Sequence, residues 1–449
     1  MPVWVEIRAN FLAWFILALC SALPVLGLWL LVGRKRGLFP PQRTRFVPWS
    51  GFEVCFAFLF TELLLPALVN ELLNKIAFFN WLYGPGFEMG LGAAEGDLAD
   101  ARRRLWVSAV SFPFQLAGIV MALRALSGTR LFQLGLATRG AVRNVVSGWV
   151  AWLLLTPPVL ILHVLVAWGY RVWEGVPPEE HPLARLARAQ PLPVEWVLIV
   201  LAGVVIAPIL EELLFRRVLQ GWAAGRPWGA PITSACAVAL AFGRSLEKIT
   251  KGWDGASLGS AFRALEPTMF VLIMVPVCFF GERLFRRWLP RPHAARAISS
   301  TALFFAVSHD WPTPVPLFVL GLGLGYLAYR TQSLVAPIIV HALFNGVACL
   351  LMLLTYAGPV NGKETTSADC RPSSASTSRI VPGSWLPLRT YASAIACPSL
   401  GETTEEVTRP TSLSAWKSLA PAHCLRFTFA SSLPANGKRK PQSDRLTWP

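Results

Sequence analysis

Long, uninterrupted apolar runs constrain this chain more than any other feature of its sequence. A helix needs roughly 20 apolar residues to cross a bilayer, because the hydrocarbon core is about 30 Å thick and each residue adds about 1.5 Å. Seven runs are long enough, at about residues 10–33, 47–72, 105–126, 145–169, 195–215, 268–288 and 334–357. Three shorter runs, at about 231–243, 298–309 and 314–329, predict short, tilted or buried helices. We therefore predict an all-α fold, a polytopic transmembrane helical bundle with about 8–10 membrane helices.

The composition agrees with a membrane protein and argues against a nucleic-acid binder. Hydrophobic residues make up 54% of the chain and charged residues 15%, whereas soluble domains carry roughly a quarter charged residues. The net charge of +16 comes from Lys and Arg that cluster between the apolar runs, as the positive-inside rule expects. We expect the lipid bilayer to be a partner and predict no nucleic-acid partner.

The charges in the loops predict how the chain crosses the membrane. The segments after the first and third runs are basic and should be cytoplasmic; their charges include Arg34, Lys35, Arg36, Arg43, Arg45, Arg124, Arg130, Arg139 and Arg143. The loops after the second and fourth runs are more acidic and should lie outside. The helix around residues 199–221 then ends at the cytoplasmic face. We predict an integral membrane protein, in the inner membrane if the chain is bacterial.

The C-terminal part of the chain differs from the rest. Residues 1–190 are predicted to form N-terminal transmembrane helices, and residues 191–357 a second group of helices. From 358 to 449 the chain is rich in Ser, Thr and Pro without sustained periodicity. Such a segment cannot bury enough apolar area to offset its ordering entropy, so we predict a disordered tail. A shifted reading frame would also produce this composition.

Two adjacent glutamates stand inside one apolar run, IVLAGVVIAPILEELLFRRVLQG at residues 199–221. Ionisable residues within spans are costly and are functional candidates by default. Residues four apart share a helix face, so Arg216 should lie beside Glu212, while Glu211 is rotated away by about 100°. Arg216 can then neutralise Glu212 and leave Glu211 free to accept a proton.

Two further polar patterns occur in later apolar runs. One is Phe305-Ala-Val-Ser-His309, and the other is His341-Ala-Leu-Phe-Asn345, whose polar ends share a helix face. Together with the glutamates they supply two carboxylates, two imidazoles and an amide. This set suits hydrolysis, which needs a base for water and donors for an oxyanion.

The ordered patterns EExxxR, FxxxH and HxxxN on successive apolar helices resemble the CAAX-processing and bacteriocin-processing (CPBP, Abi) family of intramembrane proteases. The stretches EELLFRRVLQ and LGLGYLAYRTQSLVAPIIVHALFN are similar to that family too. The resemblance implies that residues 191–357 form a catalytic core. It also implies a CAAX protease type II-like endopeptidase that cleaves a protein or peptide substrate near the cytoplasmic leaflet.

The resemblance assigns roles to the matching positions. Glu211 would activate a water molecule that His309 helps to hold. His341 and Asn345 would stabilise the tetrahedral oxyanion. Three other motif residues would support these four: Glu212, Arg216 and Phe305.

The resemblance leaves the cofactor open between two alternatives. The family is often described as glutamate-dependent and metal-free, so we expect no cofactor. Two histidines and a glutamate are also a zinc ligand set, and Glu211, His309 and His341 would then bind the metal. The zincin motif HExxH is absent from the sequence.

An insert separates the first two motifs, at about residues 223–297, where the family has a short connection. Its two apolar runs and basic ends predict an added membrane hairpin. The main alternative to an enzyme is a non-catalytic membrane protein, of a binding or immunity type, on the same scaffold. A transporter with a proton relay ranks below both, because no inverted repeat is visible.

Overall fold

The computed structural model describes residues 47–83, 93–136, 140–174, 182–189, 191–252, 258–285, 292–310 and 313–356. All of them belong to the first of two compact units, Met1–Thr366. Every regular element within these ranges is a helix, which confirms the predicted all-α fold. The first predicted run, 10–33, and the predicted tail, 358–449, lie outside the described residues.

Six of the described helices are long and apolar enough to cross a membrane. They cover Gly51–Lys75, Leu98–Ser127, Ala141–Val172, Pro193–Ala224, Arg263–Gly281 and Val335–Tyr356. Each matches one of the long runs predicted from the sequence. Large apolar side chains such as Phe52, Met121 and Val164 are exposed on these helices, as expected where lipid is the solvent. The chain is therefore an integral membrane protein.

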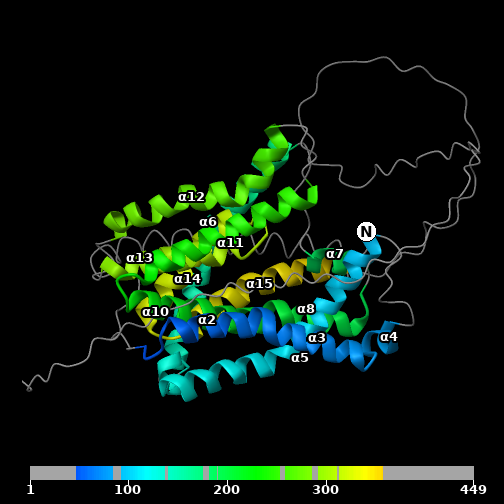
Figure 1. Cartoon of the computed structure of the whole chain (residues 1–449), viewed down its shortest axis with the longest axis horizontal. Helices are drawn as coiled ribbons and strands as arrows, with labels where there is room; N and C mark the ends of the chain where they lie inside the picture. Colours follow the sequence, from blue (N-terminus) through cyan, green and yellow to red (C-terminus); the bar gives the residue numbers. More distant parts are fainter. Residues whose placement is uncertain are drawn as a thin grey trace, which may run out of the picture. The chain divides into compact units, whose positions relative to one another are not determined.

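The first half of the described region forms three of these spans and several short helices. In order these are α2 (Gly51–Leu59), η1 (Phe60–Leu64), α3 (Leu65–Lys75), α4 (Phe78–Tyr83), α5 (Ala93–Ser127), η3 (Leu131–Leu134), α6 (Ala141–Glu174) and α7 (Pro182–Arg188). The elements α2, η1 and α3 make one continuous helix with a π-helical turn in its middle. α3 packs against α5, and α6 packs against two later helices (Figure 1).

One continuous span carries the first motif and changes its winding four times. It consists of α8 (Pro193–Val200), η4 (Leu201–Ile206), α9 (Ala207–Glu211), η5 (Glu212–Leu219) and α10 (Gln220–Ala224). Both η segments are π-helical. Single π-helical turns within α-helices occur frequently at functional sites. The two glutamates lie where α9 passes into the second of these turns.

The remaining helices include the insert and the other two motifs. They are α11 (Gly229–Gly252), α12 (Leu258–Phe285), α13 (Pro292–Val307), α14 (Pro314–Thr331) and α15 (Val335–Tyr356). The three shorter apolar runs thus correspond to α11, α13 and α14. α11 packs against both α12 and α13, and α14 packs against α13, α15 and α6 (Figure 1). The insert is therefore a helical hairpin that rests on the helix of the second motif.

A buried polar cluster joins α4 and α5 to the start of α8. The wholly buried carboxylate of Glu195 accepts hydrogen bonds from the Tyr83 hydroxyl at 2.7 Å and from Arg102 Nε at 2.9 Å. Its other oxygen accepts the Leu192 N–H at 2.6 Å, which caps α8. Burial and the Glu195 carboxylate raise the pKa of Tyr83 well above its usual range, so the hydroxyl stays protonated and donates. This cluster fixes the N-terminal helices against the span of the first motif.

We expect Glu195→Gln to lower the stability of the folded protein by about 3 kcal/mol, because it leaves the Arg102 charge without its buried partner. The measurement is the thermal unfolding midpoint in detergent. Glu71→Gln is the control, since Glu71 forms only an exposed pair with Lys75. Equal midpoints for the two variants would contradict this role for the cluster.

Candidate active site

Three helices bring Glu211, His309 and His341 to one place. Oε2 of Glu211 lies 4.0 Å from Nε2 of His309 and 3.8 Å from Nε2 of His341. Among the described residues, this oxygen has no hydrogen-bond partner. The side chains of Glu211, His309 and His341 are 25%, 31% and 6% exposed, so the point where they meet is partly open to solvent. The residues predicted to handle water therefore converge, although they lie far apart in the chain.

Hydrogen bonding fixes the orientation of the His309 ring. Nδ1 lies 2.8 Å from the carbonyl oxygen of Phe305, one turn earlier in the chain. A carbonyl can only accept, so the proton of the neutral ring sits on Nδ1. Nε2 then faces Glu211 as an acceptor.

The ion pair of Arg216 and Glu212 holds the imidazole of His341. Nδ1 of His341 lies 3.0 Å from Oε1 of Glu212, and Oε2 of Glu212 lies 3.2 Å from Nε of Arg216. Both partners of this ion pair are completely buried. Because the Glu212 carboxylate accepts the Nδ1 proton, Nε2 of His341 is directed toward Glu211. The two adjacent glutamates thus have different surroundings, as the helix-face argument predicted.

Phe305 forms the wall behind these groups. It is fully buried, and the guanidinium carbon of Arg216 lies 4.6 Å from its ring centroid. Its ring meets those of His309 and His341 edge-on, at centroid distances of 4.8 and 6.0 Å. An aromatic face stabilises a cation placed over it, particularly one shielded from water. Phe305 therefore contacts three of the polar residues and excludes water from behind them.

The Asn345 side chain contacts the backbone of the span that carries the first motif. Its Nδ2 donates to the carbonyl oxygen of Gly203, in the first π-helical turn, at 2.8 Å. In that turn the Ala207 N–H bonds to the carbonyl of Ala202, five residues back. The next bond in this register would join Pro208 to Gly203, but proline has no N–H. The Asn345 amide therefore donates to the Gly203 carbonyl, which Pro208 leaves without a backbone donor.

The two arginines of the first motif are both buried. Arg217 donates to the carbonyl oxygen of Gln133 and lies over the Trp49 ring, at 5.7 Å from its centroid. Gln220, one turn further, donates to the carbonyl of Gly325 at 2.9 Å. A Cβ at position 325 would come within 2.7 Å of Gln220 Oε1, so a larger residue there would displace the end of the Gln220 side chain. These residues dock the end of the first-motif span onto α14 and η3, and they are not interfacial charges.

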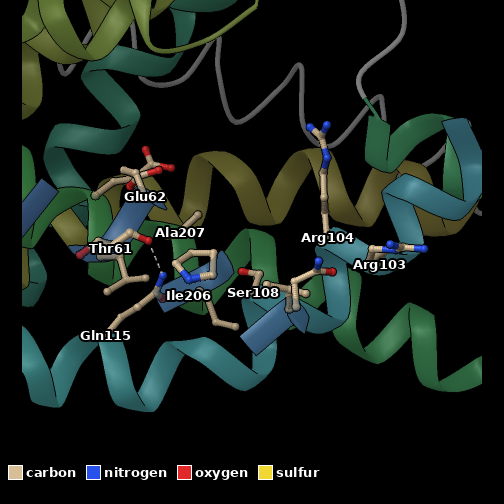
Figure 2. Close-up of a pocket in the computed structure, with 13 residues that line it drawn as sticks. Thr61, Glu62, Arg103, Arg104, Ser108, Gln115, Ile206 and Ala207 are labelled. Carbon is tan, nitrogen blue, oxygen red and sulfur yellow. Dashed lines mark hydrogen bonds between the residues drawn. The ribbon is translucent and has the colours of Figure 1, made fainter. Parts of the chain in front are cut away.

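A cavity of about 540 Å³ opens beside Glu211. It is lined by the helices α3, α5 and α9 with the π-helical turns η1 and η4 (Figure 2). Glu62 lies at one end, and Arg103 and Arg104 lie at the other. At the Glu62 end, Gln115 Nε2 donates to the Thr61 carbonyl oxygen at 2.8 Å (Figure 2). A volume of this size is typical of sites that enclose a ligand.

Sequence reasoning missed two residues near this site. Glu62 is a carboxylate inside the apolar run 47–72, so the rule that singled out Glu211 could have found it. Arg244, in the insert, donates to the carbonyl of His309. Its position offered no comparable signal, because it lies in a helix outside the three motifs.

The side chains at the site are of types that can bind a metal, but their spacing does not suit one. Two imidazoles and a carboxylate are ligands that catalytic zinc uses. Within the described part of the chain, however, no group of three or more His, Cys, Asp or Glu is arranged to hold a metal ion. The separations of 3.8 and 4.0 Å also exceed the roughly 3.3 Å between donors that share a tetrahedral zinc at about 2.0 Å. The residues as placed do not fit zinc.

Comparison with known protein families gives a match to the part of the chain that carries the motifs. The family described as type II CAAX prenyl endopeptidase, Rce1-like, matches residues 193–265 and 263–347. The match includes all three motifs and covers less than half of the chain. No curated protein and no solved structure matches the chain. Residues 193–347 therefore match the model of the Rce1-like family of CAAX endopeptidases, which confirms the resemblance seen in the motifs.

The contact between Asn345 and Gly203 predicts a testable coupling. We expect Asn345→Leu to lower stability by about 1–3 kcal/mol, because the Gly203 carbonyl is left without a donor. Pro208→Ala supplies the missing backbone N–H, so the cost of Asn345→Leu should shrink in that background. The measurement is a double-mutant cycle of unfolding free energies in detergent. An equal cost in both backgrounds would contradict the explanation.

Proposed function

We propose that this chain is a membrane-embedded endopeptidase in which Glu211 activates the water that attacks a peptide bond. The observation that carries the proposal is the position of Glu211 Oε2, within 4.0 Å of both Nε2 atoms and without a hydrogen-bond partner among the described residues. Membership of the Rce1-like family supports the same class of reaction.

The distances suit a water molecule shared by the three groups. Separations of 3.8 and 4.0 Å are too long for direct hydrogen bonds, but a water about 2.8 Å from each group would fit. Glu211 and His309 Nε2 both accept, so such a water would donate one proton to each. Its lone pair is then free to attack a carbonyl carbon. Glu211 takes the water's proton in this step and passes it to the amine that leaves.

His341 and Asn345 are proposed to stabilise the oxyanion. To donate, His341 must carry a proton on Nε2 as well as on Nδ1, and the Glu212 carboxylate balances the resulting charge. The Asn345 amide has a second N–H besides the one bound to Gly203. Removing one oxyanion donor typically lowers kcat by about 10²–10³-fold.

The cavity beside Glu211 is proposed to bind the substrate. Its lining on α5 runs from Arg103 to Gln115, which is about 18 Å of helix. That length accommodates about five extended residues. The family description makes a prenylated CAAX-type peptide the first substrate to test. Cleavage near the cytoplasmic leaflet rests on the basic loops after the first and third apolar runs.

We expect Glu211→Gln to lower kcat by about 10²–10⁴-fold without changing the unfolding midpoint, because it removes the base but keeps the shape. Glu212→Gln should lower the midpoint more than Glu211→Gln does, since it leaves Arg216 buried without its countercharge. Its effect on kcat should be smaller. The measurement is cleavage of a farnesylated CAAX-type peptide, and of membrane-tethered peptides without a lipid, by the purified protein.

Glu71→Gln controls for loss of a carboxylate on an exposed helix face. Cleavage by Glu211→Gln at the rate of the wild-type protein would overturn the proposal. A cellular phenotype that survives His341→Ala would instead favour the non-catalytic binding protein.

A separate experiment tests whether cleavage requires a bound metal. If Glu211 acts as the base, purified protein treated with 1,10-phenanthroline should keep its cleavage rate, and elemental analysis should find far less than one zinc per chain. A loss of activity that added zinc restores would make Glu211, His309 and His341 metal ligands instead.

A further inference from the structure

We propose that Arg244, on the inserted hairpin, is a positioning residue that holds the backbone of His309 in place for catalysis. The proposal rests on the role of His309 given above. It assigns the insert a task in the active site, although the insert contributes no side chain that reaches Glu211 among the described residues.

The contacts of Arg244 define the proposed role. The helix α13 ends at Val307, and Ser308 and His309 follow it without continuing the helix. Arg244 Nη2 donates to the carbonyl of Ser308 at 2.7 Å, and Nη1 donates to the carbonyl of His309. The guanidinium therefore holds two successive peptide groups.

Helix geometry explains why these carbonyls need a donor from elsewhere. The last carbonyls of a helix and the residues just after it have no partner within the helix. The C-terminal end also carries a partial negative charge, which a cation stabilises. The side chain of Arg244 is 28% exposed, so water screens these contacts only in part.

The two anchors of His309 are complementary. The Phe305 carbonyl fixes the ring through Nδ1, and Arg244 fixes the backbone from which the ring extends. Loss of the backbone anchor would let Nε2 move relative to Glu211. A displacement of about 1 Å at reacting groups can lower a rate by about 10²-fold.

The hairpin is well suited to act as a fixed support. Ala237 and Ala241 of α11 belong to one buried apolar cluster with Ala302 and Ala306 of α13. The hydroxyls of Ser245 and Thr268 lie 2.8 Å apart and join α11 to α12. Arg244 therefore extends from a helix that is already packed along α13.

The nearby ion pair with Asp310 does not account for the arrangement. The separation of Nη1 from Oδ1 is 3.6 Å, and the Asp310 side chain is 85% exposed. Exposed pairs of this kind contribute little to stability. The two carbonyl contacts are shorter and better shielded.

The test compares Arg244→Met, Arg244→Lys and Lys248→Met in the full-length protein. Lys248 lies one turn further along α11 and pairs with Glu266 of the hairpin at 3.9 Å, so Lys248→Met removes a hairpin contact without touching α13. We expect Arg244→Met to lower kcat by about 10–100-fold with KM unchanged, a loss larger than any fall in the folded fraction. Arg244→Lys should recover part of kcat, because an ammonium can reach one carbonyl. Lys248→Met should match the wild type.

A second measurement does not depend on peptidase activity. Hydrogen exchange of the amides of residues 304–310 should be faster in Arg244→Met than in the wild type or Lys248→Met. If the wild-type protein cleaves no peptide but exchange is still faster in Arg244→Met, the proposed endopeptidase function fails while the contact between Arg244 and the His309 backbone is supported. The inference is overturned by unchanged exchange, by equal kcat losses in the Arg244 and Lys248 variants, or by a kcat loss that only follows the folded fraction.

Discussion

The fully buried ion pair of Glu212 and Arg216 is the interaction on which the site depends. A single charge at this depth would be strongly unfavourable, and each residue offsets part of that cost for the other. The pair also gives His341 a carboxylate for its Nδ1, and it places the Arg216 guanidinium over Phe305. One pairing on a single helix face therefore orients groups from three helices. Glu211 keeps an oxygen free because its neighbour takes the arginine.

Much of this arrangement followed from the sequence. Apolar run lengths predicted six helices that the structure describes as candidate spans. The four-residue spacing placed Arg216 beside Glu212 and turned Glu211 away from it. The convergence of Glu211 with both histidines came from the family resemblance, since helical periodicity says nothing about which helices meet. The roles of these residues in catalysis stay predictions.

Other features could not be predicted because they arise from tertiary contacts. Arg244 looks like an ordinary charge on an inserted helix until α11 packs along α13 and brings it to two free carbonyls. The Asn345 amide donates to Gly203 because a π-helical register and a proline coincide there, and its role at the oxyanion stays a prediction. Arg217, for which the sequence predicted no role, is buried against Gln133 and Trp49.

The π-helical winding around the glutamates limits how this span can change over evolutionary time. Each residue of a helix rotates the chain by about 100°, so an insertion or deletion upstream would swing Glu211 and Glu212 onto other faces. The stretches on either side of Glu211 have π-helical rather than α-helical winding, at Leu201–Ile206 and Glu212–Leu219. The span can therefore accept exchanges of one apolar residue for another, whereas a change of length between Pro193 and the glutamates would turn them away from the histidines.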